Sequence, residues 1–335
     1  MTALLDPEPE PGIIAQTHSQ LALVTSVRLE ADDIVSITFT DPDRRELPEW
    51  QPGAHIEVEL PSGLLRLYSL CGRPDERYEY KVAVLREPQG RGGSLEIHDT
   101  ALVGRQVRMN GPRNRFELKP SGRYLFIAGG IGITPILAMA RSVGDSAPWT
   151  LHYGGRSSSS MAFVDELKEL GRERVNLWPQ DVHGLLDLDR ILGSADRQTA
   201  IYCCGPAAML TAIQEHCARY APDVPVYTER FGSLPTPKPP AIFVDSERSF
   251  ELELRRTGVT VLVGPHQSAL DAIREVIPDM PFSCTEGYCG SCEAAVLEGT
   301  PDHRDEILTP DERERGRTMF PCVSRCLSDR LVLDV

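Results

Sequence analysis

The pattern of apolar and polar positions divides the chain into three parts. In the first part, short runs of alternating apolar and polar residues are separated by turn residues such as Pro52-Gly53. A period of two is typical of strands that bury one face. These runs cover residues 22–28, 34–40, 55–60, 65–70 and 78–85. Several strands at this spacing, without a long helix-period segment, predict a small antiparallel Greek-key β-barrel over residues 20–119.

A different pattern begins at Arg123. Apolar runs at 124–128, 149–153 and 200–203 have the composition of buried strands. Each is followed by a helix-period stretch, at 135–142, 162–170 and 206–220. Strands that alternate with helices favour right-handed crossovers and a parallel sheet, so we expect an α/β domain over residues 120–232.

The last third follows a segment that cannot build a core. Residues 233–240 (SLPTPKPP) contain four prolines, so we expect a semi-rigid linker at 233–241. The acidic, proline-rich residues 1–19 are expected to be a flexible lead-in. Strand patterns at 250–254 and 259–263 precede a helix at 269–276, with Ser268 as its N-cap and Asp271 three residues later. These patterns predict a third, α+β domain over residues 242–335.

Composition and charge exclude several classes of protein and partner. With 41% hydrophobic and 25% charged residues, the chain is neither an integral membrane protein nor a disordered one. The net charge of −14 argues against a nucleic-acid partner and favours a basic protein. From residue 242 onward there are 18 acidic residues and 10 arginines, so about −8 of the charge lies in the last third. We expect that third either to dock a partner or to carry an acidic surface for solubility alone.

Four of the nine cysteines have a spacing that iron–sulfur proteins use. They are Cys284, Cys289, Cys292 and Cys322, in the order C-x4-C-x2-C, a long gap and a final C. This is the plant-type ligand set of a [2Fe–2S] cluster. Gly287 and Gly290 would let the backbone approach the inorganic sulfides without a Cβ between them. Zinc fits less well, because structural zinc sites favour two short cysteine pairs and only one is present.

The other cysteines and the start of the chain indicate the compartment. We expect Cys326, Cys71 and Cys217 to be small buried residues rather than ligands. The acidic residues 1–11 lack the apolar run of a secretory signal. We therefore expect a cytoplasmic protein, in which cysteines serve metals or redox chemistry more often than disulfides.

Two glycine turns in the middle third suit a dinucleotide. Residues 128–135 (AGGIGITP) join a strand to a helix, whose first N–H groups can bind a pyrophosphate. Here we expect Thr134 as N-cap and Pro135 as the first helical residue. Residues 202–206 (YCCGP) would place Cys204 at the carboxyl end of a strand, where parallel sheets bind ligands. The candidate nucleotide-binding residues are Gly129, Gly130, Gly132, Arg156, Ser157, Cys204, Gly205 and Pro206.

The residues alone favour NADPH over NADH. Arg156 and a run of serines follow the second strand of this domain, and no acidic residue occurs before Asp165. An acidic side chain at this place would favour the free 2′-hydroxyl of NADH, whereas arginine favours the 2′-phosphate of NADPH.

Two motifs in the barrel suit a flavin. In residues 66–70 (RLYSL), Arg66 and Tyr68 share one face of the predicted strand. They offer a guanidinium for a phosphate and an aromatic ring for the isoalloxazine, and Ser69 offers a hydroxyl to the flavin edge. Residues 90–94 (GRGGS) supply a row of N–H donors for a terminal phosphate.

The order of these motifs resembles the phthalate dioxygenase reductase family over about residues 20–335. The motifs are RLYSL, GRGGS, AGGIGITP, YCCGP, ERF and the C-terminal CTEGYCGSC…CVSR. The resemblance implies FMN rather than FAD, NADH as electron donor, and a last domain with the β-grasp ferredoxin-like fold. It implies that the FMN-binding residues are Arg66, Leu67, Tyr68, Ser69, Ala83, Val84, Leu85, Gly92, Gly93, Ser94, Thr134 and Phe231. Leu85 stands where relatives often carry a lysine.

The resemblance also implies a function. NADH releases two electrons together as a hydride and a [2Fe–2S] cluster accepts one, so a flavin between them has to store the difference. We therefore predict the reductase of a multicomponent oxygenase system, which passes single electrons to a Rieske-type oxygenase of aromatic catabolism. A cysteine-haem monooxygenase is a second acceptor, and an iron–sulfur redox sensor is an alternative of another class. We expect a monomer with no catalytic acid or base, in which Thr134, Cys204 and Phe231 neighbour the hydride-transfer site.

Overall fold

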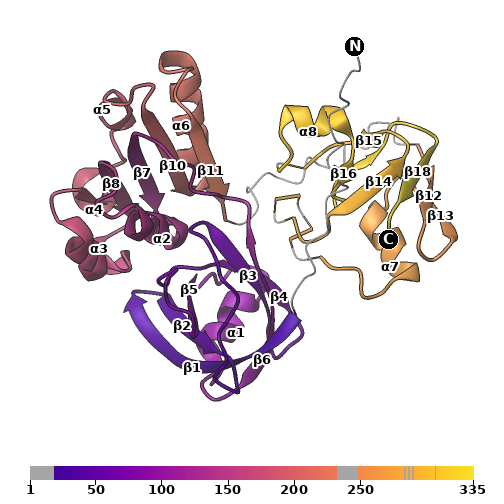
Figure 1. The fold of residues 1–335 in the computed structure, drawn as a ribbon, viewed down its shortest axis with the longest axis horizontal. Helices are drawn as coiled ribbons and strands as arrows, with labels where there is room; N and C mark the ends of the chain where they lie inside the picture. Colours follow the sequence, from indigo (N-terminus) through magenta and orange to yellow (C-terminus); the bar gives the residue numbers. More distant parts are fainter. Residues whose placement is uncertain (1–18, 232–247, 283, 286, 289, 306) are drawn as a thin grey trace, which may run out of the picture.

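In the computed structural model, the three sequence patterns form three separate main sheets (Figure 1). The structure describes residues 19–231 and 248–335, except 283, 286, 289 and 306. The expected linker at 233–241 and nearly all of the expected lead-in lie outside the described residues. The predicted fold class is confirmed: an antiparallel barrel, an α/β domain with a parallel sheet, and a C-terminal α+β domain follow one another along the chain.

The first sheet is a six-stranded antiparallel barrel in the order β4-β3-β6-β1-β2-β5. Its strands are β1 (Ser19–Ala31), β2 (Ile34–Thr40), β3 (Ala54–Glu59), β4 (Leu65–Ser69), β5 (Glu79–Leu85) and β6 (Gln106–Asn114). A bridge between Leu70 and Val82 joins the end of β4 to β5 and closes the barrel. Buried alternate residues such as Val24, Ile37 and Phe39 fill its interior.

Two elements of the barrel were not predicted from the sequence. Strand β6 buries Val107 and Met109 in regular alternation, but Gly111-Pro112 inside it has the composition of a turn. Helix α1 (Gly93–Asp99) is too short to show a helical period, and it begins within the GRGGS motif.

The second sheet is parallel throughout, in the order β11-β10-β7-β8-β9. Its strands are β7 (Arg123–Gly129), β8 (Trp149–Gly155), β9 (Val175–Pro179), β10 (Thr199–Gly205) and β11 (Val226–Arg230). The helices are η1 (Gly130–Gly132), α2 (Ile133–Val143), η2 (Ser158–Ser160), α3 (Val164–Gly171), α4 (Gln180–His183), α5 (Leu188–Leu192) and α6 (Ala207–Tyr220). The predicted strands are the three central ones. The edge strands β9 and β11 are half-buried, so they lack a continuous apolar run.

The predicted start of helix α2 is wrong. The helix begins at Ile133 after Gly132, whose backbone is already helical, so Thr134 is inside the helix and not its N-cap. The buried Thr134 hydroxyl donates a 3.0 Å hydrogen bond to the carbonyl of Ile131. The helix starts early because the 3₁₀ turn η1 runs directly into it.

The third main sheet is mixed, in the order β13-β12-β18-β14-β16. The strands are β12 (Phe250–Leu254), β13 (Val259–Val263), β14 (Ala294–Glu298), β16 (Thr318–Met319) and β18 (Arg330–Leu333), and β15 (Pro301–Asp302) pairs with β17 (Arg325–Cys326). Helix α7 (Ala269–Val276) buries one face in the core of this domain, and α8 (Pro310–Arg315) lies beyond β15. The Ser268 hydroxyl accepts the N–H of Asp271, as the sequence predicted.

A charged network joins the barrel to the parallel-sheet domain. Lys81 on β5 lies 3.2 Å from Glu30 and 3.2 Å from Glu166 of helix α3. Arg141 of helix α2 pairs with the same Glu166 and donates to the carbonyl of Cys71 at 2.7 Å. Because the network crosses between the two sheets, it fixes their relative position. Within the part of the chain that the structure describes, no helix is both long and apolar enough to cross a membrane.

Candidate functional site

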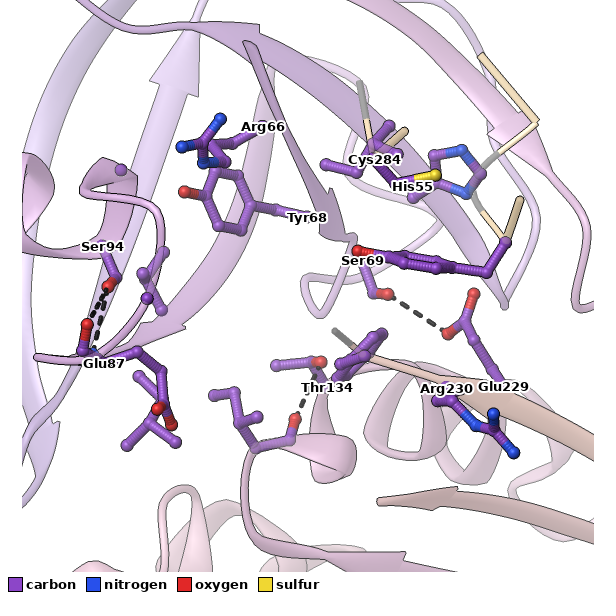
Figure 2. Close-up of a pocket in the computed structure, with 18 of the residues that line it drawn as sticks. His55, Arg66, Tyr68, Ser69, Glu87, Ser94, Thr134, Glu229, Arg230 and Cys284 are labelled. Carbon is purple, nitrogen blue, oxygen red and sulfur yellow. Dashed lines mark hydrogen bonds between the residues drawn. The ribbon is translucent and has the colours of Figure 1, made fainter. Parts of the chain in front are cut away.

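A cavity of about 1030 Å³ lies where the three domains meet (Figure 2). Strands β4 and β5, the loop at 87–94, the turn before α2, the end of β11 and the cysteine-rich loop all contribute to its wall. Of the twelve residues predicted for FMN, eleven line the cavity and only Gly92 does not. The residues selected for FMN by the motifs and the family resemblance therefore lie together at one cavity, and their binding of FMN stays a prediction.

One end of the cavity carries two guanidinium groups. Arg66 donates a 2.6 Å hydrogen bond to the carbonyl of Arg91 in the GRGGS loop. Its side chain lies across Gly93, where an added Cβ would be 2.5 Å from the Arg66 Nε. Burial lowers the pKa of Arg66, and the nearby charge of Arg91 lowers this pKa further. Two cations beside a glycine backbone fit a phosphate group, because a dianion would relieve their repulsion.

The cavity wall includes a half-buried carboxyl group that the sequence analysis did not select. Glu229 lies at the end of β11, and the Ser69 hydroxyl donates to it at 3.3 Å (Figure 2). Burial raises the pKa of Glu229 to about 8, although the bond from Ser69 opposes this shift. Glu229 therefore carries a proton at neutral pH. Its only signal in the sequence is its place in the ERF motif, two residues before Phe231.

A second polar group that the sequence analysis missed is His55 on β3. It lies opposite Ser69 in the register of β3 and β4 and lines the cavity. Its Nε2 atom is buried and has no hydrogen-bond partner in the described structure. Burial lowers the pKa of His55 to about 4, and the charges of Arg113 and Arg115 act in the same direction, so the ring is neutral at pH 7.

The predicted nucleotide-binding residues lie at the carboxyl ends of β7, β8 and β10, outside the wall of this cavity. The two glycine turns pack against each other: a Cβ on Gly132 would be 2.2 Å from the carbonyl oxygen of Cys204. Gly130 has a φ of +55° and nothing within 4 Å of its Cβ position, so its side of the turn is open. Cys204 is fully buried, and burial raises the pKa of its thiol.

The other residues of this set differ in exposure. Arg156 is exposed and directly follows β8. Ser157 caps the short helix η2. Gly205 and Pro206 form the turn into α6, where a Cβ on Gly129 would be 2.6 Å from the Pro206 ring.

The cysteine-rich loop and the segment that carries Cys322 bring three of the four predicted cluster ligands together. Cys284, Cys292 and Cys322 are buried, and the Cys322 thiol lies within hydrogen-bonding distance of the other two. Cys289 lies outside the described residues. Gly287 has a φ of +78°, and a Cβ there would be 2.6 Å from Val323. Two thiols of a glycine-bearing loop that converge with a third from a distant segment fit a [2Fe–2S] cluster.

One predicted ligand of this cluster site also lines the cavity, whereas a neighbouring cysteine has a different partner. Cys284 belongs to it and also lines the cavity, so the cluster loop and the flavin-type wall face each other. Cys326 is half-buried, and its sulfur lies 3.1 Å from the Ser328 hydroxyl.

Comparisons with known proteins agree with this geometry. Residues 252–327 match the 2Fe-2S iron-sulfur cluster binding domain, and residues 126–215 match the oxidoreductase NAD-binding domain. The toluene-4-sulfonate monooxygenase system reductase subunit TsaB1 of Comamonas testosteroni is 40% identical over 93% of this chain and 98% of its own length. The phthalate dioxygenase reductase of Burkholderia cepacia is 35% identical over 91% of this chain and 94% of its own length.

A solved structure gives a further match. An intact type IV self-sufficient cytochrome P450 monooxygenase has a TM-score of 0.85 and 40% identity over 95% of this chain. This chain spans 41% of that longer protein. These long matches cover all three domains, in the order in which they follow one another in this chain. The chain therefore belongs to the phthalate dioxygenase reductase family and is an oxidoreductase whose cofactors are FMN, NADH and a [2Fe–2S] cluster.

Proposed function

We propose that this protein is the reductase component of an oxygenase system, which takes electrons from NADH and delivers them singly to a Rieske-type oxygenase. The observation that supports this proposal most directly is the shared cavity. Its wall combines the flavin-type residues of the barrel, the end of β11 and Cys284 of the cluster loop. A hydride donor and a one-electron acceptor can therefore face the same bound flavin.

The roles of individual residues follow from their places in the cavity. FMN, when bound, supplies the conversion of one two-electron transfer into two one-electron transfers. Arg66 and the GRGGS loop would hold its phosphate, and Tyr68 and Phe231 would cover the ring. Glu229, protonated at neutral pH, holds a proton next to the Ser69 hydroxyl. Cys284 would help to hold the [2Fe–2S] cluster, which would supply the one-electron exit from the flavin.

The nucleotide would enter along the carboxyl edge of the parallel sheet. The open side of Gly130 and the adjacent end of helix α2 suit a pyrophosphate. NADH is the donor of this family. Arg156, exposed after β8, is the feature that would allow NADPH to be used as well.

A cysteine-haem monooxygenase is the second candidate acceptor. It is favoured by the match to the self-sufficient P450 protein, in which a chain segment like this one is part of a P450 monooxygenase. Relatives such as the TsaB1 reductase subunit, matched over nearly their whole length, favour a separate oxygenase component.

Two measurements test the proposal. The purified protein should contain FMN, iron and sulfide and should reduce cytochrome c steadily with NADH. An iron–sulfur sensor would contain the cluster but show no steady-state reduction. Turnover of a purified Rieske oxygenase in the presence of this protein and NADH, without turnover of a purified P450, would then establish the acceptor. The reverse result would overturn the Rieske assignment in favour of the haem acceptor.

A further inference from the structure

Arg91 contacts both the phosphate end of the cavity and the cluster loop. Its carbonyl oxygen accepts the 2.6 Å hydrogen bond from Arg66. Its guanidinium donates to the carbonyl of Cys284 at 2.7 Å and lies 3.5 Å from the Tyr288 hydroxyl. One residue of the barrel therefore joins the GRGGS loop to a predicted cluster ligand 193 residues later in the chain.

Two further contacts attach the same loop to the barrel. The buried Ser291 hydroxyl donates to the buried Glu57 carboxylate at 3.2 Å. Glu57 is held in place by Asn110, which donates to it at 2.9 Å. Beside this pair, Arg115 forms an ion pair with Glu293. Among the described residues, these contacts dock the cluster loop on the barrel, and the contact from Arg91 is the one that reaches the phosphate end.

The charges of Arg66 and Arg91 at the phosphate end of the cavity explain how a bound phosphate would affect the contact between Arg91 and Cys284. Arg66 and Arg91 are near enough for their charges to repel, and Arg66 is partly desolvated as well. A phosphate dianion between them would remove this repulsion and fix the GRGGS loop. With the loop fixed, the Arg91 guanidinium is oriented toward the Cys284 carbonyl.

We propose that Arg91 is a positioning residue that couples binding of the flavin phosphate to docking of the cluster loop. This inference rests on the proposed function, because it concerns the same flavin and cluster. The rate of electron transfer falls steeply with distance. Transfer from the flavin to the cluster would therefore be fast only after the phosphate has bound and the loop is docked. A flavin without a phosphate would fill the ring site and leave the loop loosely docked.

Hydrogen exchange of the full-length protein tests this coupling directly. The flavin-stripped protein with its cluster intact is measured alone, with saturating FMN and with saturating riboflavin, which lacks the phosphate. We expect FMN to slow exchange about tenfold or more in peptides that contain Cys284 and Ser291, and riboflavin to change it less than twofold. In Arg91→Ala, FMN should no longer protect these peptides. Arg108→Ala on β6, which removes a surface ion pair with Glu59 of β3, is the matched control and should respond as the wild type does.

Electron transfer gives the second readout. In Arg91→Ala saturated with FMN, reduction of the flavin by NADH is measured in the same experiment, so that any loss from weaker phosphate binding is recorded separately from transfer to the cluster. Reduction of the cluster, followed by its absorbance in a stopped-flow instrument, should slow about tenfold or more, by analogy with other losses of positioning. Equal protection by riboflavin and FMN, or an unchanged rate of cluster reduction in Arg91→Ala, would overturn the inference. A wild-type protein that binds no FMN or no cluster would instead overturn the proposed function.

Discussion

Ser69 and Glu229 form a 3.3 Å hydrogen bond inside the cavity, although 160 residues separate them in the chain. Ser69 ends strand β4 of the barrel, and Glu229 lies at the end of β11 in the parallel sheet. The bond therefore exists only when the two domains are packed together. It holds the carboxyl group of Glu229 in the cavity wall, beside the residues that would bind the flavin.

The half-buried Glu229 predicts a specific dependence of stability on pH. Burial raises its pKa from 4.5 to about 8, so between these values the folded protein holds a proton that the unfolded chain has released. Folding then takes up a proton, and the free energy of unfolding decreases as the pH rises through this window. Glu229→Gln lacks this loss. In flavin-stripped protein, the melting temperature of the variant minus that of the wild type should increase from pH 5 to pH 9.

An exposed acid provides the control for this measurement. Glu79 lies at the exposed start of β5, so Glu79→Gln should shift the melting temperature by a similar amount at every pH. A constant difference for Glu229→Gln across the same range would show that the carboxyl group is ionised in the folded protein and would contradict the assignment.

The sequence predicted one wall of the cavity and missed the other for a physical reason. The alternation of a strand is local, so Arg66 and Tyr68 could be assigned to one face of the barrel from five adjacent residues. The burial of Glu229 depends on how two domains pack, and no local pattern records that. His55 was missed because the run at 55–60 predicts only a strand, and the sequence does not show that its Nε2 is buried without a hydrogen-bond partner.

The helix start at the glycine turn shows a second limit of local signals. Thr134 followed by Pro135 has the composition of an N-cap and first helical residue. The backbone of Gly132 is already helical, however, so the helix begins earlier, at Ile133. The Thr134 hydroxyl bonds back to Ile131 in place of capping. Thr134 lines the cavity, and its predicted place beside the flavin stays a prediction.

The cysteine assignments predict different outcomes for two conservative substitutions. Cys289→Ser removes a predicted ligand, so the protein should lose most of its iron and its transfer of electrons to cytochrome c. Reduction of the bound flavin by NADH should survive, because that step needs only the first two domains. Cys326→Ser is the control: its sulfur contacts Ser328, so iron content should stay near two per chain. Iron and sulfide analysis and the spectrum of the reduced cluster measure both. Full iron content in Cys289→Ser would exclude it as a ligand.

The packed glycine turns predict a loss of stability that does not come from a lost contact. In Gly132→Ala, the new Cβ would be 2.2 Å from the Cys204 carbonyl oxygen, so one of the two turns has to move. Overpacking of this kind costs about 1–3 kcal/mol, which lowers a melting temperature by several degrees. Gly122→Ala, where the nearest atom is 3.5 Å away, is the control in the same domain. The melting temperatures of both variants measure this cost. A Gly132→Ala protein as stable as Gly122→Ala would show that the turns are loosely packed.

Arg156 predicts how the nucleotide preference can be changed. Its side chain is exposed directly after β8, at the carboxyl edge where the adenosine ribose of a bound nucleotide would lie. A guanidinium there attracts the 2′-phosphate of NADPH and has little to offer the neutral 2′-hydroxyl of NADH. In Arg156→Gln, kcat/KM for NADPH should fall about tenfold, a loss of about 1.4 kcal/mol, while kcat/KM for NADH changes less than about threefold. Arg172→Gln, an exposed arginine after α3, controls for the general loss of positive charge and should leave the ratio unchanged. If the ratio of the two values is the same in Arg156→Gln as in the wild type, the ribose lies elsewhere and the family's preference for NADH has another structural cause.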